Sequence, residues 1–538
     1  MSAPRVPASP ESIAIVNGRI WTADDRRRWA DALLTNGDRL AVVGSSAEVM
    51  KRAGSAARVI DAAGKLVLPG FIDAHIHFLL GGLGLSSVQL RDASTPREFA
   101  RRIAEFARSR PAGTWIRNGD WDHERWGGEL PRREWIDADT PDHPVWVNRL
   151  DGHMSLLNGA ALRAANITRD TADVDGGTIV RDAAGEPTGI LKDNAEQLVA
   201  RVAPPPGNAE LDDALDAAMR FVASRGVTSV NHMGTWEDLA VFERAHAANR
   251  LGTRIYAAVP IHTWERLADR VRASGRGDEW LRIGALKGFV DGSLGSHTAA
   301  MIDPYDDAPG DRGLLVITPA DLHAWTTQAD ANGLHLMVHA IGDLAIRTQL
   351  DIYERVIREN GMRDRRFRIE HAQHLHAADV PRFGTLGVIA SMQPYHAIDD
   401  GRWAERLIGA ERAKLTYACR SLLDAGARLA FGSDWFVAPP TPLEGIYAAV
   451  TRRTLDGKHP GGWIPEQRIT VEEALRAYTR DAAYAAFQEA DTGSLTAGRL
   501  ADFVVIDRDL TRIPAEEIAE ARVEMTVVGG RVVYASSS

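Results

Sequence analysis

Cysteine is almost absent from this sequence, since Cys419 is the only one among 538 residues. A single cysteine cannot form an intrachain disulfide, and it cannot supply a cluster of thiolate ligands to a metal. Any metal that the chain binds must therefore be held by histidine, by carboxylates or by a modified side chain.

Long apolar runs and an excess of positive charge are also missing. No uninterrupted apolar stretch approaches the roughly 20 residues of a membrane span. The N-terminal segment 1–18 lacks the positively charged segment and apolar run of a secretory signal. The net charge of −10 and the pI of about 6.0 argue against a nucleic-acid or anionic-membrane partner. We expect a soluble cytoplasmic protein that acts on a small molecule.

Two regions at opposite ends of the chain have the texture of short β-strands. In 1–68 and 488–538, apolar residues alternate with polar ones, and Gly, Asn and Asp interrupt them. This pattern predicts one small β-sandwich domain built from both termini. Two unrelated β-extensions are the alternative.

Between these ends, short apolar strands alternate with amphipathic helices. Repeated strand-then-helix units predict a parallel sheet, and we assign 69–84 plus 206–487 to an α/β fold, a (β/α)₈ TIM-like barrel. An open doubly wound sheet is the alternative, but the Gly-rich phosphate loop typical of that fold is absent.

The segment 85–205 breaks this rhythm, which indicates an inserted subdomain over the barrel mouth. It contains five tryptophans: Trp115, Trp121, Trp126, Trp135 and Trp146. They suggest an apolar or aromatic part of the substrate, or else they form the hydrophobic core of the insert itself.

Polar side chains with metal-binding chemistry follow several predicted strands. His75 and His77 are two apart in a strand, so both imidazoles point to the same face. A pair of this kind is weak evidence alone. Four further strand ends carry one candidate ligand each: Lys287, His339, His371 and Asp434. Each alone could be a packed or capping residue, but together they predict a metal site, with zinc the best match to imidazole and carboxylate ligands.

Longer motifs make a family resemblance explicit. They are DAHIH, GDWDHERWGGELPRREWIDADTPDHPVWVNRLDGHMSLLNGAAL, KGFVDGSLGSHTAAM, VHAIGDLAI, RIEHAQH, SMQPYHAIDD and GSDWFVAPPTPLEGI. The set resembles the amidohydrolase superfamily, and within it the YtcJ-like branch (amidohydrolase family 3) that includes N-substituted formamide deformylase. The resemblance spans nearly the whole chain.

The resemblance implies roles for the candidate ligands. His75 and His77 would bind the more buried metal, and His339 and His371 a second one. Lys287 would be carboxylated on its amine and bridge both metals. If Lys287 is unmodified, the site holds one metal only. Zinc is expected in one or two copies, with manganese, iron, cobalt or nickel as alternatives.

Three of these residues are also the expected catalytic groups, namely Asp434, Lys287 and His339. A bound metal lowers the pKa of water to about 7. Asp434 would accept the proton of that water and deliver it to the leaving amine. The metal or a nearby histidine would polarise the scissile carbonyl.

A further set is predicted to bind substrate because its members lie in or near strand-end motifs. It comprises Trp121, Asp122, His153, Asp291, His297, Gln373, His396, Tyr417 and Arg420. Support of the metal ligands or packing of loops is the alternative for each of them.

The predicted function is a metal-dependent hydrolase that cleaves a C–N bond of an amide, formamide or cyclic amide by attack of a metal-bound hydroxide. Hydrolysis of an ester, lactone or carbamate at the same site is the alternative, followed by a non-catalytic metal-binding barrel. A Ser-His-Asp hydrolase lacks support because no G-x-S-x-G motif appears. A homodimer is plausible, since twofold assemblies are the commonest oligomers.

Overall fold

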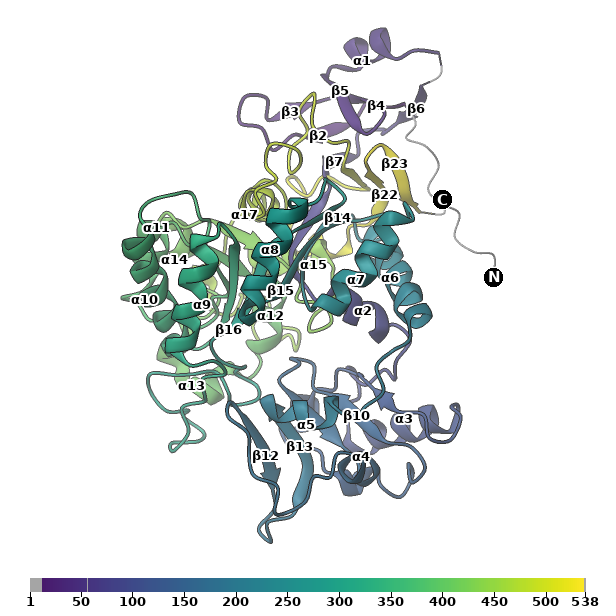
Figure 1. Ribbon diagram of the computed structural model, residues 1–538. Coiled ribbons are helices and arrows are strands. Elements are labelled where there is room, and N and C mark those ends of the chain that lie inside the picture. The colour runs from purple at the N-terminus through teal and green to yellow at the C-terminus, as the bar shows by residue number, and fades with distance from the viewer. Residues whose placement is uncertain (1–11, 56, 537–538) are drawn as a thin grey trace.

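A computed structural model describes residues 12–55 and 57–536 (Figure 1). At its centre, eight parallel strands form one sheet in the order β8-β14-β15-β16-β17-β18-β19-β20. Their bounds are β8 Phe71–Ile76, β14 Val227–Met233, β15 Arg254–Pro260, β16 Leu281–Phe289, β17 His335–Ala340, β18 Arg368–His371, β19 Ile389–Met392 and β20 Leu429–Phe431.

The first and last strands of this sheet approach each other, so the sheet is a nearly closed barrel. The backbone N–H of Asp434, just after β20, donates to the carbonyl of His75 in β8 at 2.7 Å. The N–H of Ser433 donates to the Asp73 carboxylate at 3.0 Å. The predicted TIM-like α/β barrel is therefore confirmed, and the open doubly wound sheet is wrong.

Helices alternate with these strands and cover the outside of the barrel. They are α6 Asn208–Ala223, α7 Trp236–Ala247, α8 Trp264–Ser274, α9 Pro319–Ala331, α10 Asp343–Asn360, α11 Val380–Leu386, α14 Cys419–Asp424, α15 Pro442–Thr451, α16 Val471–Ala477 and α17 Arg480–Ala485. Their starts are set locally: Thr318 accepts from the Asp321 N–H and Pro319 opens α9, while Thr235 and Asp238 form a capping box at α7. In the part of the chain that the structure describes, no helix is long and apolar enough to cross a membrane.

Two further sheets are formed by the ends of the chain, and the larger one contains strands from both ends. A four-stranded sheet has the order β5-β4-β1-β6, and a six-stranded sheet has the order β23-β22-β21-β7-β2-β3. The bounds are β1 Ile13–Val16, β2 Arg19–Trp21, β3 Trp29–Ala30, β4 Ala32–Asn36, β5 Arg39–Gly44, β6 Arg58–Asp61, β7 Leu66–Pro69, β21 Phe503–Ile506, β22 Val523–Val528 and β23 Arg531–Ala535. Ile13 and Ile15 of the smaller sheet lie in one buried cluster with Val67 and Phe503 of the larger.

Between β8 and α6 the chain forms a separate five-stranded sheet in the order β12-β13-β11-β10-β9. Its strands and flanking helices are α3 Pro96–Arg108, β9 Ile116–Arg117, β10 Val145–Asn148, β11 Met154–Leu157, α4 Gly159–Ala164, β12 Gly177–Arg181, β13 Pro187–Asp193 and α5 Gln197–Ala200. Figure 1 shows this segment on the opposite side of the barrel from the two sheets of the termini. It contacts the loops that follow barrel strands: Asp151 accepts from Ser293, and Lys192 donates to the carbonyl of Ser296 at 2.7 Å.

Candidate metal centre

The candidate ligands converge at one end of the barrel. His75 lies in β8 and His77 just after it, while Lys287 is near the end of β16 and His371 ends β18. Asp434 follows β20. Because all strands of a parallel barrel point the same way, their carboxyl ends meet at one mouth, which brings together residues far apart in sequence.

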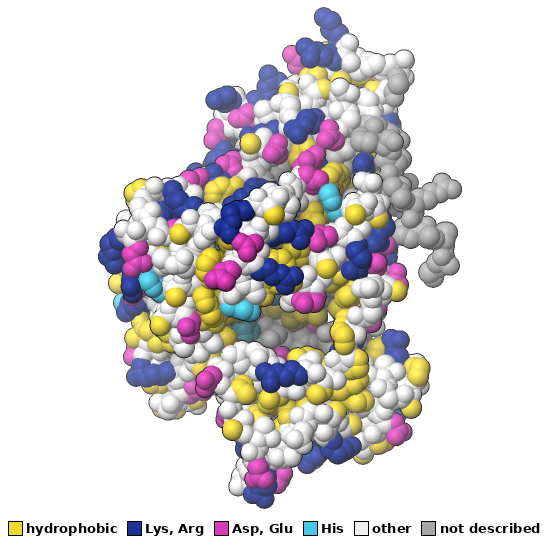
Figure 2. Space-filling model, viewed as in Figure 1, with side chains coloured by type: hydrophobic (Ala, Val, Ile, Leu, Met, Phe, Trp, Pro, Cys, Tyr) yellow, Lys and Arg dark blue, Asp and Glu magenta, His cyan; other side chains and the backbone are white. Residues whose placement is uncertain are grey.

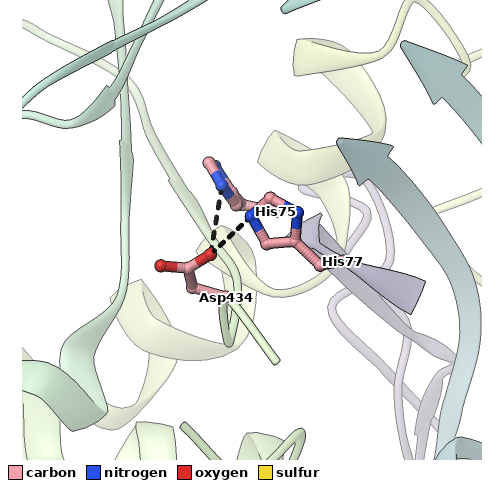
Figure 3. Close-up of side chains that lie close together, drawn as sticks. All are labelled: His75, His77 and Asp434. Atoms are coloured by element: carbon pink, nitrogen blue, oxygen red, sulfur yellow. Dashed lines mark ion pairs between the residues drawn. The ribbon is translucent and has the colours of Figure 1, made fainter. Parts of the chain in front are cut away.

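His75, His77 and Asp434 form one compact group (Figure 3). Oδ1 of Asp434 lies 3.3 Å from Nε2 of His75 and 3.2 Å from Nε2 of His77. The same oxygen is buried and accepts no hydrogen bond within the described residues. Burial raises the pKa of Asp434, but the neighbouring His75 and His77 outweigh this and hold it well below its usual range. Asp434 is therefore an ionised acceptor with an unused lone pair.

A second group consists of His371, His396 and the same Asp434, whose ligand atoms all lie within 4.8 Å of one another. His396 comes from α12 (Pro394–Asp400), and its buried Nε2 has no hydrogen-bond partner among the described residues. His371 and Asp434 both have positive φ, +73° and +58°. Such backbone costs of order 1 kcal/mol or more and is concentrated at functional sites. His396, predicted to bind substrate, thus lies with the candidate ligands.

Two of the histidines are held in one orientation by buried partners. Nδ1 of His75 lies 2.6 Å from Glu370, which also accepts from Arg368 at 2.7 Å. Nδ1 of His371 lies 2.9 Å from the side-chain oxygen of Gln393. Each contact engages Nδ1 and leaves Nε2 available to a metal. The sequence analysis missed these partners, although two charged residues two apart in the buried strand β18 were an available signal.

Lys287 lies against the first group. Its Nζ is 3.3 Å from Nε2 of His75 and 4.8 Å from the centre of the Phe289 ring. Burial lowers the pKa of Lys287 to about 8. A minority of the amine, about a tenth at pH 7, is therefore neutral, and a neutral amine does not repel a metal ion.

His339 borders the site but belongs to neither group. Its ring centre is 4.5 Å from that of His371 and 5.1 Å from that of His153. Its Nε2 lies 2.9 Å from the carbonyl of Gly292 and 3.5 Å from Asp291. In this arrangement Nε2 of His339 is engaged by the loop after β16.

Asp291 is fully buried and organises the loops around the mouth. Its carboxylate accepts backbone N–H groups of Ala300 at 2.8 Å, Ile341 at 3.0 Å and Gly342 at 2.8 Å. Burial raises its pKa to about 7 despite these three donors. The contacts of Asp291 therefore join the segments after β16 and β17, whose side chains face the site.

A small cavity of about 50 Å³ opens beside His371 and Asp434. Among the residues predicted to bind substrate, it is lined by Asp122, His153, Gln373 and His396. It is also lined by residues that the sequence analysis missed: Arg149, Asp151, Asp399, Asp400, Arg402 and Trp403. The motifs that contain these residues could be recognised in the sequence. Their side chains line one cavity only because the insert packs against the barrel loops.

Besides Asp291, four other predicted residues do not line this cavity. Trp121 is fully buried in the core of the insert, where its Nε1 donates to the carbonyl of Val147 at 2.8 Å. The side chain of His297 lies 3.0 Å from Asp307, and Arg420 donates to Glu473 at 2.6 Å. Tyr417 reaches the site indirectly, through its hydrogen bond to Asp400. The roles of these four stay predictions.

Comparison with known proteins decides the family. The model described as "Amidohydrolase family" matches residues 58–534, which is most of the chain. The chain belongs to the amidohydrolase family. The resemblance inferred from the motifs is thereby confirmed.

Individual members of the amidohydrolase family match over nearly their full length. The protein LONG AFTER FAR-RED 3 of Arabidopsis thaliana is 40% identical over 535 residues, which is 97% of this chain and 91% of that protein. The N-substituted formamide deformylase of Arthrobacter pascens is 31% identical over 546 residues, 97% of this chain and 98% of that enzyme. An uncharacterized metal-dependent hydrolase from Pyrococcus horikoshii superposes with a TM-score of 0.76 at 27% identity, covering 94% of this chain and 99% of that one. The chain is thus an amidohydrolase-family, metal-dependent hydrolase.

The donor atoms of the site fit a metal ion. Two ligands of one zinc ion, each about 2.0–2.2 Å from it, lie roughly 3.3–3.5 Å apart in tetrahedral geometry. The distances from Asp434 to His75 and His77, 3.3 and 3.2 Å, are close to this spacing. The unpartnered Oδ1 of Asp434 and Nε2 of His396 also fit, because buried polar atoms normally have a partner.

Proposed function

We propose that the protein hydrolyses the C–N bond of an N-substituted amide, with formamides and cyclic amides within its range. The observation that carries the proposal is the position of Asp434, which is shared by two histidine groups at the barrel mouth. The name of the Arthrobacter pascens relative, N-substituted formamide deformylase, supports the choice of bond.

The metal ions we propose are one or two zinc ions. His75, His77 and Asp434 would hold one, and His371, His396 and the same Asp434 offer the donors for a second. A bound zinc ion supplies Lewis acidity, which polarises a carbonyl and makes water more acidic. The contact between Glu370 and His75 keeps one donor set in place before the metal arrives.

The proton chemistry is assigned to Asp434. Hydrolysis forms a C–O bond from water and breaks the C–N bond, so one proton must leave the water and one must reach the amine. An ionised carboxylate that gives Oδ1 to a metal can accept the first proton on its other oxygen and deliver the second.

His153 is suited to orient the carbonyl oxygen. Burial lowers the pKa of His153, but its 2.6 Å contact with Asp193 and the charge of that carboxylate raise it to about 9. It is therefore protonated at neutral pH, and it lines the small cavity. A cationic donor there would stabilise negative charge that develops on the oxygen.

Lys287 is proposed to carry a carboxyl group. Carbamylation joins carbon dioxide to a neutral amine with loss of a proton, and the pKa of about 8 makes that neutral form accessible. The resulting anion would lie within reach of the site next to His75. If the amine stays unmodified, the site would hold one metal.

Elemental analysis combined with a substrate panel tests the proposal. We expect one to two equivalents of zinc or a similar metal in the wild type, less in His75→Ala and in Lys287→Ala, and an unchanged content in His246→Ala, an exposed histidine paired with Asp278. The wild type should release formate from N-substituted formamides. Protein that takes up no metal on reconstitution would overturn the proposal. Cleavage of ester isosteres but not of amides would support the alternative ester, lactone or carbamate hydrolase.

A further inference from the structure

A second and much larger cavity lies between the barrel and the insert. Its volume is about 850 Å³, compared with about 50 Å³ for the cavity beside Asp434. Figure 2 shows the molecular face hollowed between these two parts. Its apolar lining comes from α2 (Phe78–Gly84), the insert and the loop after β20, and includes Leu80, Leu83, Phe106, Trp115, Trp146 and Phe436.

The two cavities lie next to each other along two segments of the chain. Asp151 and His153 line the small cavity, whereas Gly152 between them lines the large one. In the same way Val437 lines the small cavity and Phe436 the large one. In each of these two segments, residues that are adjacent in sequence therefore line different cavities.

Phe436 lies at the border between the two cavities. The ring centre of Phe436 lies 5.8 Å from that of His77, so its other side is close to the candidate ligands. Gly152 packs against the same ring and has a φ of +72°, and an added Cβ would lie 2.8 Å from Cζ of Phe436. A larger residue at position 152 would therefore crowd Phe436.

The volumes decide which part of a substrate each cavity can accept. A cavity needs about 10–15 Å³ to hold one water molecule, so a cavity of about 50 Å³ admits a few water-sized groups, enough for the carbonyl but not for a large N-substituent. Ligand sites are usually about 300–1,000 Å³, and the large cavity, at about 850 Å³, is in that range. The bulk of an N-substituted amide must lie outside the small cavity.

The large cavity also has the chemistry of a site for an apolar group. Burial raises the pKa of its Glu196 to about 8, so this carboxyl is mainly neutral at pH 7. Of the charged lining residues, Arg110 and Glu210 are exposed to solvent, and the half-buried Arg117 donates to the carbonyl of Pro204. Leu80, which is 36% exposed, lines the cavity together with the aromatic side chains named above. Exposed apolar side chains gathered at one place mark a binding surface more often than scattered ones do.

We propose that this cavity binds the apolar, aryl-bearing substituent on the amide nitrogen, with Phe436 positioning the amide between the two cavities. The inference rests on the proposed function, because it takes the carbonyl to lie beside Asp434. In this arrangement the amine product leaves through the large cavity. The tryptophans of the insert then have two different roles. Trp121 belongs to its hydrophobic core, whereas Trp115 and Trp146 line the binding cavity.

Two leucines at the two ends of α2 provide a matched test. Leu80 lines the cavity, whereas Leu85, also exposed, does not. For Leu80→Asp we expect the ratio of kcat/KM for N-(2-phenylethyl)formamide over N-methylformamide to fall at least about tenfold, mainly through KM, because a charge on the wall opposes burial of the ring. Leu85→Asp should keep the wild-type ratio.

A binding measurement makes the result independent of turnover. Calorimetric titration of the metal-loaded protein with 2-phenylethylamine should show weaker binding to Leu80→Asp than to the wild type and to Leu85→Asp. Formamide hydrolysis with an unchanged ratio in Leu80→Asp and unchanged amine affinity would overturn the inference alone. Failure of the wild type to hydrolyse any formamide would instead overturn the proposed function.

Discussion

Single side chains around the site are held in unusual charge states by their surroundings. Burial lowers the pKa of Lys287 to about 8 and raises that of Glu196 to about 8, because a poorly solvated site favours the neutral form of either group. The pKa of Asp434 is lowered instead, because its neighbouring histidines outweigh burial, and the carboxylate stays ionised. At pH 7 Asp434 is therefore ionised and Glu196 mainly neutral, whereas Lys287 is mainly charged with a minority of its amine neutral.

The shift at Glu196 makes stability depend on pH. Its ordinary pKa is 4.5 and its pKa in the folded protein is about 8, so between these values the folded state binds one more proton than the unfolded chain. The free energy of unfolding should therefore fall as pH rises through this window. We expect Glu196→Gln to lose less Tm between pH 5 and pH 8 than the wild type, by about one to a few degrees. The exposed Glu210→Gln is the control, and superimposed profiles of Glu196→Gln and wild type would contradict the prediction.

At the scale of elements, the contact between β8 and β20 positions the ligands. Asp73 accepts from both the backbone and the hydroxyl of Ser433, and the carbonyl of His75 accepts from Asp434. Gly432 lies in this contact, and an added Cβ would be 2.5 Å from the backbone nitrogen of His75. The positions of His75 and Asp434 therefore depend on residue 432 having no side chain.

Gly432→Ala should accordingly disturb both stability and metal binding. The strand would have to move, at a cost of about 1–3 kcal/mol as for other overpacked sites. We expect a lower Tm and a weaker affinity for zinc in a competition titration with a chelator. Gly310→Ala is the matched control, because its added Cβ meets no atom within 4 Å. Wild-type zinc affinity in Gly432→Ala would show that the close approach does not position the ligands.

At the scale of the whole molecule, hydrogen bonds link the six-stranded sheet of the two termini to the barrel. Asp502, just before β21, accepts two hydrogen bonds from Arg254 of β15 at 2.7 and 3.0 Å. It also accepts the Gly529 N–H at 2.7 Å. Antiparallel pairing of β7 with β21 joins the two ends of the chain in one sheet.

The oligomeric state is a separate matter at this scale, and the expected homodimer remains a prediction.

Removing this link should destabilise the whole protein. Asp502→Ala leaves the buried Arg254 without its carboxylate, and loss of one partner of a buried pair costs about 3–5 kcal/mol. We expect Tm to fall by several degrees in a thermal unfolding experiment. Asp269→Ala, which breaks an exposed pair with Arg272, should change Tm little. Equal effects of both variants would argue against a structural role for the buried pair.

The sequence by itself determined the barrel and the family. The alternation of strands and helices follows from hydrophobic periodicity, which is local, and it predicts a parallel sheet; the absence of a Gly-rich phosphate loop favoured the barrel that the structure confirms. The two-residue spacing of His75 and His77, and the placing of Lys287, His371 and Asp434 at strand ends, could likewise be read along the chain. Their convergence follows because parallel strands end at one mouth.

Only the tertiary structure decided which side chains meet. Nothing near His396 in sequence indicates that its free nitrogen lies beside Asp434, nor that His339 faces the Gly292 carbonyl. The sequence does not tell which tryptophans of the insert are core, yet Trp121 lies in the core and Trp146 lines the large cavity. Contacts of this kind depend on how the insert packs on the barrel loops, and packing between segments far apart in sequence leaves no periodic pattern to read.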